Sequence, residues 1–452
     1  MTRTLLRDRP LTPLGESLPR LESLVSQYTG VVRRVHTILA SPDDARLIRV
    51  GATTSETRQV IDADPGRRDG DGGGCAERMS EARAAAIGEA AERYAGAFLP
   101  ERSLVLATAD ELGPAAIDPP RFALFAPRQH DTPGFGFAQF RRDTRVRWAR
   151  GFALPDGKEA YVPAQLVYLT WSRLAPEEQP VAYSTSNGLA CGPTLEEAVL
   201  AGLLELVERD AFMITWAAGL SLPLLDWSSE PELLAFESRY LAAAGGRHAV
   251  VDLSDFLHVP TALAVVRGDG SREPAVAVGA GSAPSIVGAV KKALAEAYSV
   301  RSWGRGLVAA APHRTFAEDC SDVVSFADHI HLYALPSHAG AADFLTASTV
   351  VRKVEDVAVL PGVSALERIC QLTGRLRAQG VRAYAVDVTS PDVADAGLVV
   401  AKVVAPELCP LDVRHDTRFL GGSRLYRAAH ELGLRDAPLA AGDVNADPHP
   451  FP

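Results

Sequence analysis

An acidic pattern that occurs in two separate helical stretches places the strongest constraint on how this chain folds. The stretches run from Ser80 to Phe98 and from Thr194 to about Ala218. Each has two acids three residues apart, followed at once by arginine: Glu89, Glu92 and Arg93 in the first, and Glu205, Glu208 and Arg209 in the second. Residues at i, i+3 and i+4 share one helix face, so each helix presents a matching charged face.

Two interpretations of these faces are open. Glu and Arg at such offsets are common on solvated helix surfaces, where they form ion pairs. Alternatively, the two helices face each other and bring four carboxylates together, which like-charge repulsion opposes unless cations intervene. Mg²⁺ prefers oxygen ligands and completes its shell with water and phosphate oxygens, which arginines also bind. This second interpretation predicts a nucleotide site without a P-loop, since Gly157-Lys158 is followed by Glu159.

The rest of the chain alternates helical and β-rich segments. Further helices are predicted over 284–304 and 363–379, and strands over 248–253, 260–266, 274–280, 382–388 and 397–404. Gly268 to Ser271 predicts a hairpin between two of these strands. The glycine-rich segment 62–75 predicts a loop, and Asp328 to Tyr333 a strand with His329 and His331 on one face. The fold class is therefore α/β of the mixed α+β kind, with mixed sheets layered by helices.

Composition excludes several classes of partner. The 46 basic and 56 acidic residues give a net charge of −10, which argues against a general nucleic-acid binder. Apolar runs are too short to cross a membrane, and residues 1–20 lack the apolar core of a secretory signal. The 5 cysteines are scattered without a Cys-x-x-Cys pair, so neither a disulfide framework nor a zinc site is expected. A reduced, cytoplasmic chain is the default expectation.

Several motifs resemble those of the YcaO superfamily. The run from Ser186-Asn-Gly to Asp210 resembles its signature, and Glu89 to Tyr94 resembles its first acidic helix. Ala293 to Arg301 and Leu420 to Leu425 are similar to later landmarks of the family. The resemblance implies a YcaO-like fold with ATP between the acidic helices. It divides the chain into an irregular lead-in (1–20), a catalytic domain (21–440) and a Pro-rich tail (441–452) that reaches the active site.

The resemblance also implies a set of site residues. Mg²⁺ on the ATP phosphates would be held by Glu89, Glu92, Glu205 and Glu208. Further nucleotide-site residues would be Ser186, Asn187, Glu197 and Glu296, with Arg93, Arg209 and Arg301 as charge partners. Each arginine has an alternative role, which is to fix a carboxylate through an ion pair. Cys75 and Cys191 are expected to be structural, because the implied reaction needs no cysteine nucleophile.

The last residues favour one branch of the family. Pro448, Pro450 and Pro452 form a Pro-x-Pro-x-Pro ending that resembles the tail of azoline-forming YcaO cyclodehydratases. Alternating prolines favour an extended rod with little entropy to lose on docking. The resemblance implies that these prolines belong to the catalytic region, where the Pro452 carboxylate would orient a catalytic group. A frayed end is the alternative.

The implied activity is ATP-dependent cyclodehydration of a ribosomal precursor peptide, which turns Cys, Ser or Thr into thiazoline or oxazoline. A separate ThiF-like (ubiquitin-activating-like) protein is expected to bind the leader of the precursor, and family habit suggests a homodimer. Two alternatives stay open: another YcaO amide chemistry, such as thioamidation or macroamidine formation, and a noncatalytic scaffold. The scaffold is motivated by Ala85, Pro193 and Ser299, where family members often carry Ser, Asn and Gln.

Overall fold

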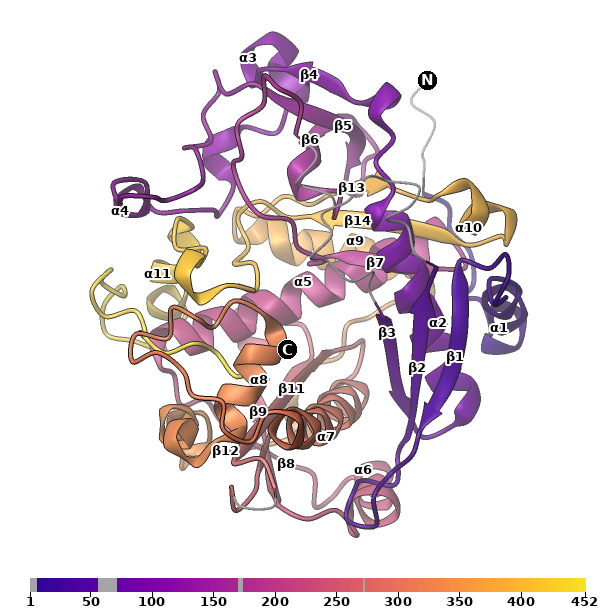
Figure 1. Ribbon diagram of the computed structural model, residues 1–452, viewed down its shortest axis with the longest axis vertical. Helices are drawn as coiled ribbons and strands as arrows, with labels where there is room; N and C mark the ends of the chain where they lie inside the picture. The colour runs from indigo at the N-terminus through magenta and orange to yellow at the C-terminus, as the bar shows by residue number, and fades with distance from the viewer. Residues whose placement is uncertain (1–5, 56–70, 170–173, 271–272) are drawn as a thin grey trace.

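Three β-sheets, each covered by one long helix, organise the computed structural model, which describes residues 6–55, 71–169, 174–270 and 273–452 (Figure 1). The strands are β1 (Val32–Ile38), β2 (Ile48–Thr54), β3 (Asp71–Ala76), β4 (Val105–Ala107), β5 (Val146–Ala153), β6 (Glu159–Pro163), β7 (Leu189–Gly192), β8 (Leu224–Asp226), β9 (Arg247–Asp252), β10 (Thr261–Arg267), β11 (Val276–Ser282), β12 (Val351–Lys353), β13 (Tyr384–Asp387) and β14 (Val399–Val404). The helices are α1 (Leu14–Ser23), α2 (Met79–Ala97), α3 (Ala109–Leu112), α4 (Pro127–His130), α5 (Leu195–Ala218), α6 (Pro231–Phe236), α7 (Ile286–Ala310), α8 (Phe326–Ala334), α9 (Ala365–Ala378), α10 (Pro391–Asp395) and α11 (Ser423–Glu431).

The sheets confirm the mixed α+β class. The first has the order β1-β2-β3 and is covered by α2, and the second has the order β11-β10-β9-β8-β12 and is covered by α7. The third has the order β4-β5-β13-β14-β7, with β6 paired to β5, and α5 packs on β14 and β7. Neighbouring strands pair antiparallel except β12 and β8, which are parallel.

Helix α5 runs through the middle of the molecule (Figure 1). The Thr194 hydroxyl caps its first turn by accepting the Glu197 N–H, and Gly219 ends it in the left-handed region with φ of 60°. Most of its side chains are buried, which explains why the sequence is apolar around almost the whole helix. Its few charged residues therefore lie inside the protein, and this excludes a solvated surface face for Glu208, which is buried.

Three sequence predictions of local structure are wrong. Residues 1–20 are not wholly irregular, because α1 begins at Leu14. The glycine-rich stretch is a strand, β3, from residue 71, whereas 62–70 lies outside the described residues. A Cβ added to Gly72 or Gly74 would meet backbone oxygens of α2 at 2.2 and 2.0 Å, so the glycines let this strand lie directly on the helix. His329 and His331 lie in helix α8 and not on a strand.

The hairpin between β10 and β11 is confirmed by antiparallel pairing from Thr261 with Ser282 to Arg267 with Val276. Ser271, at the predicted turn, lies outside the described residues. No helix in the described ranges combines the length and apolar character needed to cross a membrane.

Candidate active site

Helices α2 and α5 bring their acidic faces together because both pack against β7 and β14 (Figure 1). The charge of Glu205 on α5 acts on Glu92 of α2, and the charge of Arg93 on α2 acts on Glu205. Helix α7 adds a fifth carboxylate, Glu296, which is coupled to Glu208 and Arg209 of α5. We call Glu89, Glu92, Glu205, Glu208 and Glu296 the acidic centre.

Burial and mutual repulsion raise the pKa of three of these acids, Glu92, Glu205 and Glu296. Burial is the main cause that raises the pKa of Glu92, and the charges of Glu205 and Glu89 raise it further against the opposing effect of Arg93. Burial likewise raises the pKa of Glu205. Burial, with repulsion from Glu208, raises the pKa of Glu296 to about 8. The centre is therefore a place where a bound cation would be favoured, because it would restore the charged forms.

Backbone N–H groups fix the directions of several of these carboxylates. The Glu208 Oε2 accepts the Ser282 N–H at 2.9 Å, and the Glu296 Oε2 accepts the Ala280 N–H at 2.7 Å, both from β11. The Glu89 Oε2 accepts the Gly73 N–H of β3 at 2.7 Å. Strands of two different sheets therefore orient acids from three helices toward one region.

Nearby cations compensate only part of this charge. Arg93 pairs with Glu89 at 3.1 Å and Arg209 pairs with Glu205 at 3.3 Å, each one turn along its helix. The Lys402 ammonium lies near Glu205 and Glu92 and donates to the Thr185 carbonyl at 2.7 Å, and burial lowers its pKa to about 8. The charge of Lys292 acts on Glu296. With all groups ionised, five carboxylates would face these four cations.

The residues present fit magnesium and a nucleotide. The surplus of negative charge suits divalent cations, and the buried Nε of Arg209 has no hydrogen-bond partner within the described protein. Among the described residues, no three His, Cys, Asp or Glu side chains are arranged to hold a single metal ion. The four predicted ligands therefore do not form a closed cage. This suits Mg²⁺, which usually takes one or two carboxylates and fills its shell with water and phosphate oxygens.

Other predicted residues lie apart from the acidic centre. The Glu197 carboxylate accepts the Thr12 hydroxyl at 2.7 Å and so ties the N-terminal segment to α5. The Arg301 guanidinium pairs with Glu273 at 2.7 Å and is almost fully buried there. The structure therefore does not bring Arg301 to the carboxylates. Ser186 precedes β7, and the amide of the neighbouring Asn187 donates to the Leu411 carbonyl at 3.2 Å.

The C-terminal tail is docked along α5 and α8. The Trp216 indole donates to the Asp447 carbonyl at 3.0 Å, and the Tyr333 hydroxyl donates to the Pro448 carbonyl at 2.7 Å. The Phe451 ring is fully buried, with its centroid 4.7 Å from that of Phe212 and 5.2 Å from the Arg209 Cζ. The end of the tail therefore lies beside an arginine of the acidic centre.

The two histidines predicted on a strand face have different contacts, and His329 packs against the tail. His329 stacks on His449 of the tail with centroids 4.2 Å apart, and its Nδ1–H donates to the His449 carbonyl at 2.7 Å. Burial lowers the pKa of His329 to about 4. His331, two residues along α8, instead contacts Phe316 edge-on. Neither histidine forms part of a metal-binding cluster among the described residues.

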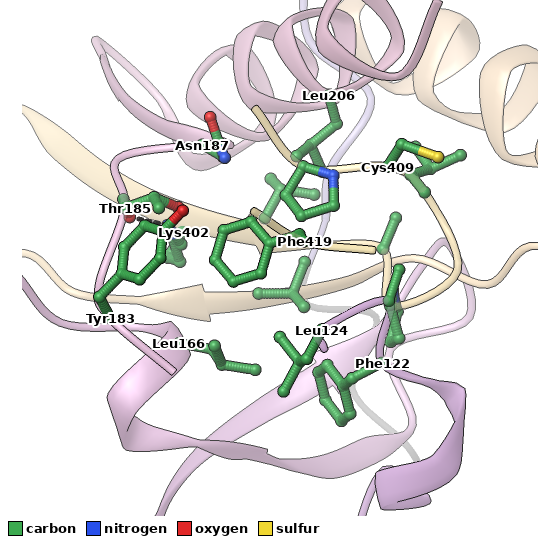
Figure 2. Close-up of a pocket in the computed structure, with 17 residues that line it drawn as sticks. Phe122, Leu124, Leu166, Tyr183, Thr185, Asn187, Leu206, Lys402, Cys409 and Phe419 are labelled. Atoms are coloured by element: carbon green, nitrogen blue, oxygen red, sulfur yellow. Dashed lines mark hydrogen bonds between the residues drawn. The ribbon is translucent and has the colours of Figure 1, made fainter. Parts of the chain in front are cut away.

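An apolar pocket opens next to Lys402 (Figure 2). Its volume is about 70 Å³. Its apolar wall includes Phe122, Leu124, Leu166, Tyr183, Leu206 and Phe419, and its polar groups include Thr185, Asn187 and Lys402. Tyr183 and Phe419 stack with centroids 4.6 Å apart, and this gives the pocket a rigid side. We call it the aromatic pocket.

Sequence analysis missed Lys402 and the aromatic pocket. The signal for Lys402 was available, because a lysine stood within the apolar run of a predicted strand, where charged residues are rarely buried without a partner. The pocket had no comparable signal. Its lining comes from segments near residues 122, 166, 185, 206, 403 and 419, which only the fold brings together.

Comparison with known proteins places this arrangement in a family. The family described as YcaO cyclodehydratase, binding ATP and Mg²⁺, matches residues 73–409. The chain therefore belongs to the YcaO family, as the sequence predicted, and the family is one of ATP- and Mg²⁺-dependent enzymes.

Particular relatives refine the comparison. An uncharacterized protein of Methanothermobacter thermautotrophicus is 30% identical over 229 residues, which cover 49% of this chain and 55% of the relative. A heterocyclase in complex with substrate and cofactor matches 99% of this chain and 59% of its own, with a TM-score of 0.82 and 24% identity. The heterocyclase TruD matches 100% of this chain and 56% of its own, with a TM-score of 0.71 and 26% identity. The chain thus spans little more than half the length of these relatives.

Proposed function

We propose that this protein is an ATP- and Mg²⁺-dependent cyclodehydratase, which converts Cys, Ser or Thr residues of a ribosomal precursor peptide into thiazolines or oxazolines. The observation that carries the proposal is the acidic centre, in which three helices of a YcaO chain bring together more carboxylates than their cations balance. The heterocyclase fold of its structural neighbours supports the same choice.

In the proposed reaction, the side chain of Cys, Ser or Thr attacks the preceding backbone carbonyl carbon. A C–S or C–O bond forms as the side chain loses its proton, and ATP phosphorylates the former amide oxygen. That oxygen then leaves as phosphate while the nitrogen loses its N–H proton and forms a double bond to the same carbon in the closed ring. ATP supplies the phosphoryl group that turns the amide oxygen into a leaving group, and Mg²⁺ offsets its charge. The protein contributes positioning and electrostatic stabilisation.

The residues of the acidic centre divide this work. Glu89, Glu92, Glu205 and Glu208 would hold Mg²⁺ at the phosphates, with their directions set by backbone N–H groups and arginines. The buried Nε of Arg209 is available to donate to a phosphate oxygen, because it has no hydrogen-bond acceptor among the described residues. In this proposal Glu197 and Arg301 are positioning residues, since the Glu197 carboxylate accepts from Thr12 and the Arg301 guanidinium forms an ion pair with Glu273, while Ser186 and Asn187 flank the nucleotide.

The tail belongs to the proposed active site. The Phe451 ring packs over the Arg209 guanidinium, which in turn pairs with Glu205, so the tail and the acidic centre share one side chain. We propose that Pro448, Pro450 and Pro452 stiffen this segment and hold its end beside the reacting amide.

Partner proteins complete the proposal. A separate ThiF-like protein would bind the leader of the precursor and deliver its core to this chain, which would act as a homodimer in a reduced, cytoplasmic setting.

The test is to incubate the purified chain with Mg²⁺, ATP, a Cys- and Ser-containing precursor peptide and the leader-binding partner. The expected result is the loss of one water mass for each modified residue, with one phosphate released per ring. Matched reactions without Mg²⁺ or with a nonhydrolysable nucleotide should leave the peptide unchanged. A mass gain that fits sulfur in place of oxygen would instead indicate thioamidation, and no ATP consumption with a competent partner would indicate a scaffold.

A further inference from the structure

We propose that the aromatic pocket binds the side chain of the substrate residue that immediately precedes the Cys, Ser or Thr being cyclised, and that it selects an apolar side chain there. This inference rests on the proposed function and adds the position in the substrate peptide whose side chain the protein recognises. Three features of the pocket support it: the apolar chemistry of the lining, the link through Lys402 to the acidic centre, and the link through residues 411–413 to the docked tail.

The lining favours an apolar guest. Stacked aromatic rings and leucines form most of the surface, and Tyr183 and Phe419 are themselves packed against Phe125, with centroids 6.5 and 5.3 Å from its ring. A volume of about 70 Å³ is several times the roughly 10–15 Å³ that one ordered water needs, so a side chain of several non-hydrogen atoms fits. The polar groups of the lining, which include Asn187 and Lys402, fit the backbone polar groups that come with such a side chain.

Lys402 connects the pocket with the acidic centre. Its side chain lines the pocket, and its ammonium interacts electrostatically with Glu92 and Glu205. The carbonyl carbon that is attacked is bonded directly to the Cα of the preceding residue. That residue must therefore place its side chain within a few bonds of the phosphoryl group, and the aromatic pocket is linked to the proposed phosphate ligands through Lys402.

The pocket also shares a wall with the docked tail. Residues 411–413 form hydrogen bonds with residues of the pocket lining and with the docked tail. Asn187 donates to the Leu411 carbonyl, and the Val413 N–H donates to the Tyr183 hydroxyl at 3.3 Å, on the pocket side. On the tail side, His449 Nε2 contacts the Asp412 carbonyl at 2.8 Å. The segment 411–413 thus joins two residues of the pocket lining to the docked tail.

Leu166 is the position at which to test the pocket. Its half-buried side chain lies between Tyr183 and Leu124, below Phe419 (Figure 2). Leu166→Trp would fill the space and Leu166→Ala would enlarge it. Leu104→Trp is the matched control, because Leu104 is a half-buried leucine of the same hydrophobic cluster that does not line the pocket.

The experiment uses acetylated, amidated pentapeptides of sequence Ala-Gly-Xaa-Cys-Gly, with Leu, Phe, Ala or Asp at Xaa. Peptide binding is measured by saturation-transfer NMR in the presence of Mg²⁺ and a nonhydrolysable ATP analogue, and water loss by mass spectrometry with ATP. Wild type should bind the Leu and Phe peptides about tenfold or more tighter than the Asp peptide, as expected for burial of one such side chain. Leu166→Trp should lose this preference, Leu166→Ala should shift it toward Phe, and Leu104→Trp should keep it.

The outcomes separate this inference from the proposed function. Equal binding of all four peptides by wild type, or an unchanged preference in Leu166→Trp with intact folding and nucleotide affinity, would overturn the pocket assignment. Ring formation at equal rates for every Xaa would also overturn it, while supporting the cyclodehydratase. Selective binding without any water loss or phosphate release, even with the leader-binding partner and its precursor, would refute the cyclodehydratase and support the pocket.

Discussion

Replacing Phe451 by alanine tests whether the docked tail is part of the active site. The ring is fully buried, with Phe212 at 4.7 Å and the Arg209 Cζ at 5.2 Å between centres. Burying a phenylalanine contributes roughly 1.5–3 kcal/mol, and an aromatic pair adds about 0.5–1.5 kcal/mol. The variant should therefore weaken docking of the tail end by about 2–4 kcal/mol, which is about 30- to 1000-fold in the docking equilibrium.

The assay compares steady-state ring formation with affinity for Mg²⁺ and a nonhydrolysable ATP analogue. Phe451→Ala should lose most of its turnover while nucleotide affinity changes little, because the carboxylates that hold the metal stay in place. Phe316→Ala is the matched control, since Phe316 also contacts an arginine, with the Arg314 Cζ 4.6 Å from its ring, but its ring packs edge-on against His331 of α8. The reasoning fails if hydrogen exchange shows the tail end released while Phe451→Ala keeps full turnover.

Three further predictions test the surrounding machinery. Glu89→Gln keeps an acceptor for the Gly73 N–H but removes the charge, so turnover should fall about 100-fold or more with an unchanged unfolding midpoint, and near-full turnover would exclude a role as a ligand. Because burial raises the pKa of Glu296 to about 8 from 4.5, its contribution to the free energy of unfolding is full below pH 4.5 and is lost as the pH rises to 8. Binding of Mg²⁺ and nucleotide at pH 7 should restore the charged form of this acid and therefore release protons. Calorimetry in buffers of different ionisation enthalpy measures that release, which Glu296→Gln should reduce; no buffer dependence in wild type would contradict the assignment. Asp210→Ala leaves Arg424 buried without its 2.8 Å partner and should cost about 3–5 kcal/mol of unfolding free energy in urea, and a loss below about 1 kcal/mol would show that this pair does not anchor α5.

The acidic centre was predictable because helical spacing carries most of the information. Two Glu-x-x-Glu-Arg faces could be placed on helices from the sequence alone, and the Thr194 cap fixed where the second helix begins. Their convergence was one of two interpretations that the sequence left open, and packing of both helices on β7 and β14 supplies its physical cause. Long, capped, periodic helices are the elements that local sequence specifies best.

Prediction from local sequence was wrong where tertiary contacts override secondary-structure propensity. The glycines before α2 signal a loop in isolation, yet Gly72 and Gly74 form a strand, because a glycine strand can lie against the backbone of a helix. The alternation around His329 suggested a strand, but a Ser325 cap and burial against the tail select a helix. The family resemblance implied that Arg301 is a charge partner at the nucleotide, whereas its guanidinium pairs with Glu273.

The aromatic pocket could not be predicted from the sequence, and the reason is a different one. Its walls come from segments that are far apart in the chain, and no periodic pattern links Leu166 with Phe419. Only Lys402 stood out locally, as a charge within a strand whose other side chains are apolar. A site built at the junction of several loops and strands becomes visible only once the fold is known.

The central claim is that carboxylates of α2 and α5 jointly hold a magnesium-bound nucleotide, and calorimetric titration with a nonhydrolysable ATP analogue tests it most directly. Wild type should bind the analogue with Mg²⁺ and lose most of its affinity when the metal is chelated. Glu205→Gln should weaken binding about tenfold or more, as expected for the loss of a charged interaction, whereas Glu318→Gln at an exposed position should bind like wild type. Equal affinity in Glu205→Gln and wild type, with no dependence on Mg²⁺, would contradict the account.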